Sequence, residues 1–443
     1  MFHRGIILLL ISALILRIFL MFVSFGHRDN PDVLRYRDWA TIAYLYHPQD
    51  AYEGKYLTFG TSPINMPPGS LYTVSLMYRL NLVAAKVLLK ITHTQPGELH
   101  WMNSQLINGF LRLPNIVGDL LTGYLIYLLV KKYKNRKHAL FASGLFLFNP
   151  SVFYNSSFWG QMDAINNALF FLGVFLYYKN KTFLSLLFLF LSLYVKLTLV
   201  FLVFPLLLLF FWLEKNKKKF TLSLSFVLLL ILAFTLPVST TPHLWFYNFL
   251  QKNGLGEMNN ITSLAFNFWW VIFKPYIAIG PPMTDWSFSE TKFMGSPPSS
   301  TVYFGLSLFM WALLLYSIVL LPLAKIVWNL KEKVVKPHNL FLLLSLFTLL
   351  SYLFLPHMHE RYLFVFFPLM ATAIGLTGKN LWIFLAITLL NFVNVYILWH
   401  PMLHPSLPHF LINAQNFQWG ISVITVILGM VLYVNIYKYL NTK

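Results

Sequence analysis

The most unusual stretch of this sequence is NPSVFYNSSFWGQMDAINN, residues 149–167, in which polar side chains interrupt an otherwise apolar chain. Trp159, Gly160, Gln161 and Asp163 stand close together within it. Glycine permits close approach of a backbone to a ligand, and amide and carboxylate side chains hydrogen-bond to hydroxyl groups. The stretch therefore indicates either a site for a hydroxyl-rich ligand or a polar helix cap.

A carboxylate that could act as a general base lies in HRDNPDVLRYRDWA, residues 27–40. Pro31 suits the first position of a helix, and Asp32 would then lie in the first turn, at the favourable end of the helix dipole. Helical spacing places Asp32 on the same face as Tyr36 and Trp39. The segment is either a base held at the mouth of a membrane cavity or an interfacial helix with a capping aspartate. Two further aspartates nearby compete for the role of base: Asp29 and Asp38.

Basic residues elsewhere could bind a phosphate group. Lys196 lies between two apolar runs, where it either extends to the membrane surface or holds a lipid-linked phosphate. The motif LPHMHERYLF, residues 355–364, adds His359, Glu360 and Arg361, and the planar guanidinium of arginine matches phosphate oxygens. The His-x-His pair of this motif has no evident third ligand, and HExxH is absent. We therefore expect no cofactor, although a divalent metal stays an open alternative.

Two more ionisable residues, Arg112 and Asp119, lie seven residues apart in RLPNIVGDLL. On a helix they share one face, but the axial rise between them is about 10 Å, which disfavours a direct ion pair. Ionisable side chains inside apolar segments are rare and mark functional sites by default. The two residues indicate either a functional site or a structural network with the first outer loop.

These residues belong to a chain with the composition of a membrane protein. Of its 443 residues, 58% are hydrophobic and 11% are charged, whereas soluble domains average about 25% charged residues. The absence of cysteine excludes disulfides, thiolate metal sites and cysteine nucleophiles. Because a span needs about 20 apolar residues, or fewer where helices are short, we predict an all-α polytopic bundle of about twelve transmembrane helices: 5–25, 109–130, 138–153, 163–178, 182–195, 199–213, 219–237, 301–324, 338–355, 361–377, 380–398 and 417–437.

The distribution of charge predicts the orientation of the bundle. The net charge is +19, and basic residues cluster in the short loops between predicted spans, as in KKYKNRK, residues 131–137. The positive-inside rule makes these loops and both termini cytoplasmic. The large segments 26–108 and 238–300 then lie outside, and the candidate residues converge at one outer cavity. The excess of basic residues is thus a topology signal and not a sign of nucleic-acid binding.

Residues 69–92 form the one apolar segment that we leave out of the spans. Arg79, Lys86 and Lys90 share one face of a helix there. This pattern favours an amphipathic helix lying on the membrane over a further span. We expect residues 1–443 to form a single integral-membrane domain.

The motifs together resemble the GT-C superfamily of integral-membrane glycosyltransferases, and most nearly the bacterial relatives of the dolichyl-phosphate-glucose-dependent glucosyltransferases of N-glycan assembly. WGQMD and MHERY are the most specific motifs. Val33 follows Asp32 where the protein O-mannosyltransferase branch has an Asp-Glu pair, which disfavours protein O-mannosylation. The matching segments are DVLRYRDWA (32–40), MPPGSLY (66–72), RLPNIVGDLL (112–121), NPSVFYNSSFWGQMD (149–163), Lys196 and HMHERYLF (357–364).

The resemblance implies a GT-C-like fold and transfer of a hexose from a polyprenyl-phosphate donor to a hydroxyl of a glycan, lipid or protein acceptor. The reaction would be inverting and would take place on the extracytoplasmic face of a bacterial cytoplasmic (inner) membrane. Asp32 matches the family's general base, with Asp29 as the competitor. The other expected site residues are Arg361, Lys196 and His359 for the donor phosphate, and Trp159, Gln161, Asp163, Arg112, Asp119 and Glu360 for the sugar, the acceptor or their support.

A flippase or transporter of lipid-linked saccharides is the alternative class. Such a protein would also have many spans and buried charges. It would be expected to place charged groups along a path open to both faces of the membrane, whereas the cytoplasmic loops predicted here are short and almost purely basic. The charge pattern therefore favours the enzyme.

Overall fold

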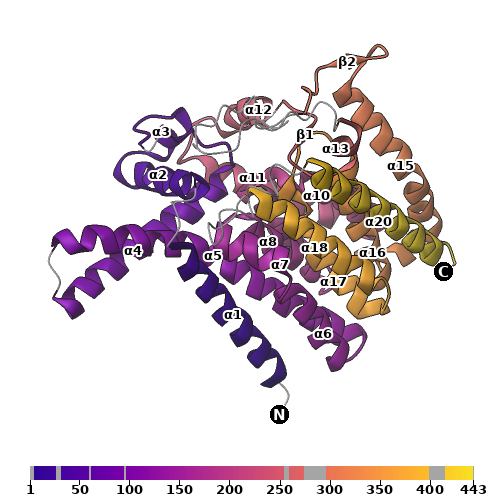
Figure 1. The fold of residues 1–443 in the computed structure, drawn as a ribbon, viewed down its shortest axis with the longest axis horizontal. Coiled ribbons are helices and arrows are strands. Elements are labelled where there is room, and N and C mark those ends of the chain that lie inside the picture. The colour runs from indigo at the N-terminus through magenta and orange to yellow at the C-terminus, as the bar shows by residue number, and fades with distance from the viewer. Residues whose placement is uncertain are drawn as a thin grey trace. The chain divides into compact units, whose positions relative to one another are not determined.

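The structure is a computed structural model that describes residues 4–25, 31–58, 61–93, 96–253, 259–273, 296–398 and 415–442. Helices dominate these residues (Figure 1). The strands within the described ranges form two short pairs: β1 (Thr262–Ser263) lies parallel to β4 (Met358–His359), and β2 (Val302–Tyr303) lies antiparallel to β3 (Leu306–Ser307). The predicted all-α membrane fold is confirmed.

Each segment predicted to span the membrane contains a helix. The helices are α1 (Arg4–Phe25), α5 (Pro96–Tyr133), α6 (Arg136–Leu147), α7 (Pro150–Phe153), α8 (Asp163–Tyr177), α9 (Thr182–Val195), α10 (Val200–Leu213), α11 (Lys217–Thr235), α15 (Leu308–Leu330), α16 (Pro337–Phe354), α17 (Phe366–Thr377), α18 (Leu381–Leu398) and α20 (Gln415–Asn441). Within the described residues, 6 helices are long and apolar enough to cross a membrane by length and composition. They are α1, α5, α11, α15, α16 and α20. The number of crossings, which we put at twelve, stays a prediction.

Shorter elements connect these helices. The described parts of the two segments predicted to lie outside contain α2 (Pro31–Leu45), α3 (Pro48–Glu53), α4 (Pro68–Thr92), α12 (Pro242–Asn253) and α13 (Phe268–Phe273). Three short 3-10 helices precede or follow longer helices: η2 (Leu197–Leu199), η4 (Lys331–Val335) and η5 (Glu360–Val365). The element η1 (Tyr154–Trp159) is a π-helix.

The chain divides into two compact units, each with its own core. The first unit comprises Met1–Leu125 and Phe153–Leu255, and the second comprises Ile126–Val152 and Gly256–Lys443. Asp32 and the 159–163 motif lie in the first unit, whereas the 357–364 motif lies in the second. The single domain expected from the sequence stays a prediction.

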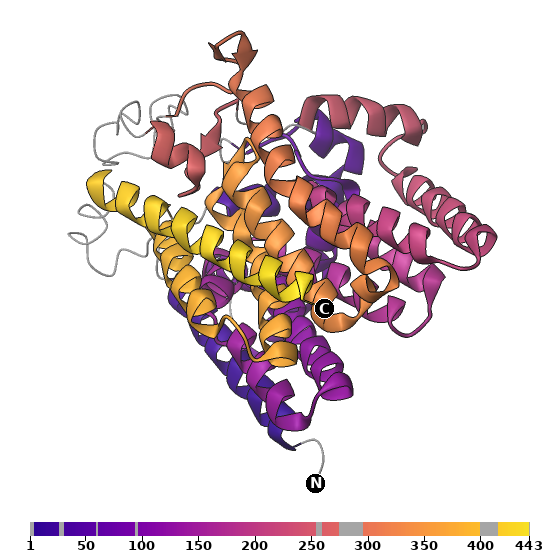
Figure 2. The same cartoon turned by 90° about the vertical axis from the view of Figure 1, so that its right-hand side faces the viewer.

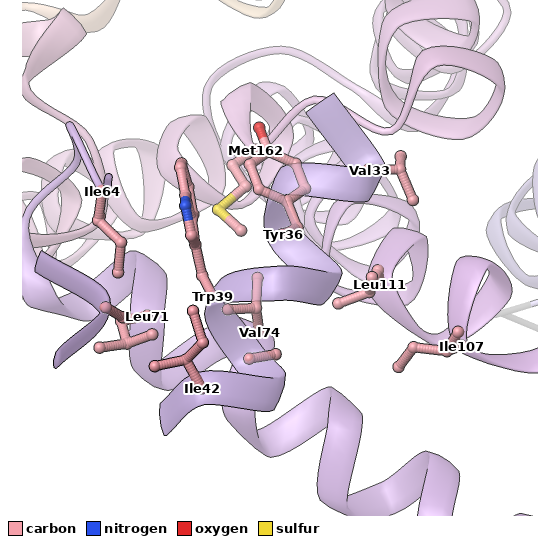
Figure 3. Packing of buried hydrophobic residues seen from close by; sticks show 12 residues of the cluster. Val33, Tyr36, Trp39, Ile42, Ile64, Leu71, Val74, Ile107, Leu111 and Met162 are labelled. Carbon is pink, nitrogen blue, oxygen red and sulfur yellow. The ribbon is translucent and has the colours of Figure 1, made fainter. Parts of the chain in front are cut away.

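A hydrophobic cluster fixes α2 within the first unit (Figure 3). Val33, Tyr36 and Trp39 of α2 pack with Leu71 of α4 and Leu111 of α5. The indole of Trp39 is 1% exposed and its Nε1 donates to the Ser62 carbonyl at 2.8 Å. Burial of these large side chains supplies the main stabilisation of the contact. Because Val33 belongs to the cluster, the orientation of the adjacent Asp32 is set by the packing of α2.

The helix α4 has one packed face and one exposed face. Val74, Asn81 and Ala85 are among its buried residues. Apolar side chains spaced along the exposed face are Leu76, Leu80, Val83, Val87 and Ile91, and the exposed cations Arg79, Lys86 and Lys90 lie beside them. The helix expected over 69–92 is confirmed, and its contact with the membrane surface stays a prediction.

In the second unit, α20 packs along α15, α16 and α18, as Figure 2 shows in yellow and orange. Buried asparagines tie the segment 259–273 to these helices. The side-chain Oδ1 of Asn394 accepts from the backbone amide of Phe266 at 3.0 Å, and the side-chain Nδ2 of Asn267 donates to the backbone carbonyl of Tyr352 at 3.1 Å. Since β1 in this segment pairs with β4, the network holds the start of the 357–364 motif in place.

Candidate active site

The π-helix η1 brings the WGQMD motif to the site. It ends at Trp159 and is followed by Gly160, whose φ of 87° is a left-handed conformation that glycine adopts at little cost. A Cβ at this position would lie 3.1 Å from Arg112 Cγ and 3.2 Å from Val33 Cγ2. Glycine is therefore the residue that makes this turn between α2 and α5 with the least strain. Single π-helical turns are rare and are frequent at functional sites.

The turn places two hydrogen-bond donors on the carboxylate of Asp32. The Trp159 indole Nε1 donates to Asp32 Oδ2 at 2.9 Å, and the Gln161 amide Nε2 donates to the same oxygen. The Tyr36 hydroxyl donates to Gln161 Oε1 at 3.5 Å, which turns the amide NH₂ group toward Asp32. The other carboxylate oxygen, Oδ1, lies 4.0 Å from Arg35 Nη1. The Asp32 side chain is 24% exposed, so it is oriented and still accessible.

The structure separates Asp32 from its neighbour Asp38. Asp38 is 2% exposed and accepts the Thr58 amide at 2.9 Å, the Thr58 hydroxyl at 2.5 Å and the Thr61 hydroxyl. These contacts tie α2 to the segment that follows α3, a structural role. Trp39 is likewise part of the core, as described above. Asp29 lies outside the described residues.

Lys196 and Asp163 form a buried ion pair in the first unit. Lys196 Nζ lies 2.7 Å from Asp163 Oδ1, and the two side chains are 9% and 7% exposed. The Asn155 amide donates to Asp163 Oδ2 at 3.4 Å. Lys196 follows the last turn of α9, and Gly69 at the start of α4 packs against the carbonyl of the nearby Tyr194. The charge of the lysine is thus balanced by a residue that the sequence also placed in the site.

Arg112 and Asp119 contact different ends of η1. Arg112 donates through Nη2 and Nε to the Phe158 carbonyl at 3.2 and 3.4 Å, and through Nη1 to the Asn108 carbonyl at 2.8 Å. Asp119 Oδ2 accepts from Arg17 Nε at 2.9 Å and from the Ser156 hydroxyl at 2.6 Å. The expectation that Arg112 and Asp119 form no direct pair is consistent with these contacts.

Arg17 is the residue of this network that the sequence did not assign to the site. Its only signal was a single arginine within the apolar run of the first helix. The structure places it on α1, 0% exposed, against Asp119 of α5. A buried charge without an evident partner nearby in sequence is the signal that could have found it.

The 357–364 motif forms a second charged cluster, which lies in the second unit. Glu360 is 2% exposed, with Arg361 Nη1 3.0 Å from its Oε1 and His359 Nδ1 3.7 Å from its Oε2. Burial acts to raise the pKa of Glu360, but the Arg361 guanidinium and His359 outweigh burial and hold the pKa below its usual range. His357 Nε2 contacts the Ser299 hydroxyl at 2.9 Å. Arg361 is therefore a cation held in place by its neighbour.

Within the described ranges, no three histidine, aspartate or glutamate side chains gather as ligands for a metal ion. The carboxylates of the first unit instead accept hydrogen bonds from tryptophan, glutamine, serine, threonine, lysine and arginine side chains. Such surroundings suit proton transfer and charge stabilisation by side chains.

Comparisons with known proteins give a likeness in structure but none in sequence. No family model matches the chain, and no curated protein matches it. Among solved structures, the chain is similar to ArnT from Cupriavidus metallidurans bound to undecaprenyl phosphate, with 12% sequence identity, a TM-score of 0.45, and coverage of 100% of this chain and 78% of that chain. The function is therefore inferred from this chain's own residues.

Proposed function

We propose that this protein is a membrane glycosyltransferase of the GT-C type, with Asp32 as the general base. The observation that carries the proposal is the pair of donors, Trp159 and Gln161, on one oxygen of a partly exposed carboxylate. Both donors come from WGQMD, one of the two specific motifs on which the family resemblance rests. A polar helix cap, the other reading of this stretch, gives no reason for its side chains to reach a carboxylate 127 residues away.

The proposed mechanism uses one general base, Asp32. An acceptor hydroxyl gives its proton to Asp32 as its oxygen attacks the anomeric carbon of the donor sugar. The bond from that carbon to the phosphate oxygen breaks, and the electron pair leaves with the polyprenyl phosphate. Trp159 and Gln161 hold Oδ2 and thereby orient the carboxylate that takes the proton. One attack from one side inverts the configuration of the sugar.

The donor we propose is a hexose linked to a polyprenyl phosphate, used on the extracytoplasmic face of a bacterial cytoplasmic membrane. A polyprenyl tail requires a site at the edge of an apolar bundle, and Asp32 begins a helix directly after the apolar α1. Lys196, Arg361 and His359 are the proposed ligands of the phosphate. Lys196 is held by Asp163 and Arg361 by Glu360, which avoids the cost of an unpaired buried cation while the donor is absent.

The experiment is a transfer assay with the purified full-length protein in lipid nanodiscs. A panel of radiolabelled polyprenyl-phosphate hexoses is incubated with fractionated envelope glycans, lipids and proteins. We expect label to move from one donor to one acceptor class, with inverted configuration in the product. In parallel, the protein is placed in proteoliposomes. Movement of the labelled lipid across the bilayer without transfer of sugar would overturn the proposed glycosyltransferase activity and would indicate a transporter.

A further inference from the structure

We propose that the buried pair Arg17–Asp119 is a positioning device for the proposed active site. It holds the π-helix η1 through Ser156 and thereby sets where Trp159 and Gln161 meet Asp32. This inference rests on the proposed function for its catalytic meaning. The geometry on which it depends lies entirely within the first unit.

The pair joins three elements of the first unit. Arg17 Nε on α1 lies 2.9 Å from Asp119 Oδ2 on α5, and both side chains are 0% exposed. The same Oδ2 accepts the Ser156 hydroxyl of η1 at 2.6 Å, and α1 packs against η1. A charge-assisted hydrogen bond is about twice as strong as a neutral one. Ser156 is therefore a firm anchor for the first half of the π-helix.

The second half of the π-helix has its own anchor on the same helix of the bundle. Arg112, two turns before Asp119 on α5, donates to the Phe158 carbonyl. The residues that follow, Trp159 and Gln161, donate to Asp32. The π-helix is thus held at two points by α5, and the two hydrogen-bond donors to Asp32 follow the second point: Trp159 ends the π-helix and Gln161 lies just beyond it.

The pair is costly as a purely stabilising contact. Arg17 Nη2 and Asp119 Oδ1 are buried and have no hydrogen-bond partner among the described residues. A buried ion pair that is not fully hydrogen-bonded is often no better than a pair of apolar side chains of similar volume. Stability alone therefore does not explain the two charges, whereas the need to hold Ser156 does.

Three variants separate positioning from general packing. Ser156→Ala removes the link and leaves the pair intact. The double variant Arg17→Met, Asp119→Leu replaces the pair by apolar side chains and avoids a lone buried charge. Thr122→Val is the matched control, because Thr122 has a buried hydroxyl on α5 that, among the described residues, donates within its own helix to the Gly118 carbonyl.

The first readout needs no substrate. The full chain is labelled with 5-fluorotryptophan, and the ¹⁹F resonance of Trp159, one of 13 tryptophans, is assigned with Trp159→Phe. We expect Ser156→Ala and the double variant to move this resonance toward its position in Asp32→Ala, and Thr122→Val to leave it unchanged. An unmoved resonance in the first two variants, or an equal shift in Thr122→Val, would overturn the proposal.

The second readout applies once a donor is known. Ser156→Ala is expected to lower kcat about tenfold with KM unchanged, because a small displacement of the base is enough for such a loss. In a Gln161→Ala background the same substitution is expected to have little further effect, because the two act through one contact. Equal losses in both backgrounds would contradict positioning. Since the fluorine measurement requires no transfer, a failure of the proposed function and a failure of this inference are distinguishable.

Discussion

The indole nitrogen of Trp159 lies 2.9 Å from Asp32 Oδ2, although 127 residues separate the two in the chain. The contact joins the first turn of α2 to the end of the π-helix η1. One oxygen of the carboxylate is therefore held by a hydrogen bond from a protein side chain and does not depend on a water molecule. A base that is oriented before the substrate arrives needs little reorganisation during the reaction.

Replacing Trp159 with phenylalanine removes this donor and keeps an aromatic ring. We expect kcat for sugar transfer to fall about tenfold, since one preorganised hydrogen bond contributes roughly 1–2 kcal/mol. Binding of the polyprenyl-phosphate sugar should be retained. Steady-state kinetics measures the change. Trp269→Phe is the control, because Trp269 Nε1 donates to the Phe354 carbonyl in the second unit. That variant should lower the thermal midpoint and leave kcat of the folded protein unchanged, and a loss of kcat equal to that of Trp159→Phe would contradict the assignment.

Asp38→Asn tests whether the second aspartate of α2 is structural. Asp38 accepts three hydrogen bonds from Thr58 and Thr61, and an amide in its place turns one acceptor into a donor. We expect a loss of about 2 kcal/mol in stability, seen as a lower thermal midpoint, with transfer by the folded fraction retained. Abolished transfer with unchanged stability would instead make Asp38 the base.

Gly160→Ala tests the turn at the end of the π-helix. The φ of 87° is unfavourable for alanine by roughly 1–2 kcal/mol, and the added Cβ would also press on Arg112 and Val33. We expect losses of both stability and transfer. Gly378→Ala is the matched control, since Gly378 has a φ of 71° and an added Cβ there would have no heavy atom within 4 Å among the described residues outside its immediate chain neighbours. Equal effects in the two variants, measured by thermal unfolding and transfer, would show that crowding at Gly160 has no role.

The second unit should lose stability in acid because of Glu360. Burial opposes ionisation of this carboxyl, but Arg361 and His359 hold its pKa below the usual range of a glutamate. A lowered folded-state pKa means that the stabilisation is present above the unfolded value and is lost as the pH falls through the folded value. Thermal midpoints measured between pH 7 and 3 should therefore drop at the acid end. In Glu360→Gln the midpoint should already be low at pH 7 and this component of the pH dependence should vanish; an unchanged acid drop would contradict the role of Glu360.

Several features of the site could be predicted from the sequence because they depend on local patterns. Pro31 marks the start of α2, and Asp32 lies in its first turn as expected. The polar residues of the 159–163 motif stand out against the apolar chain, and two of them contact Asp32. The axial rise of a helix was enough to disfavour a pair between Arg112 and Asp119.

Other features depend on tertiary contacts that no local pattern encodes. Arg17 meets Asp119 across 102 residues, a partnership that the apolar first helix does not specify. The hydrogen bonds of a π-helix span one residue more than those of an α-helix, and hydrophobic periodicity is too coarse to show that difference over six residues. Asp32 and Asp38 have similar sequence surroundings, and only the threonines that fold back onto Asp38 distinguish them.

The most direct test of the account is the turnover of Asp32→Asn. The variant keeps the shape of the side chain and removes the base, so we expect transfer to fall by a factor of about 10²–10⁴, with the thermal midpoint and binding of the polyprenyl-phosphate sugar unchanged. The measurement is single-turnover transfer of radiolabelled sugar by wild type and variant in the same nanodiscs. Transfer by Asp32→Asn at the wild-type rate would contradict the assignment of Asp32 as the general base.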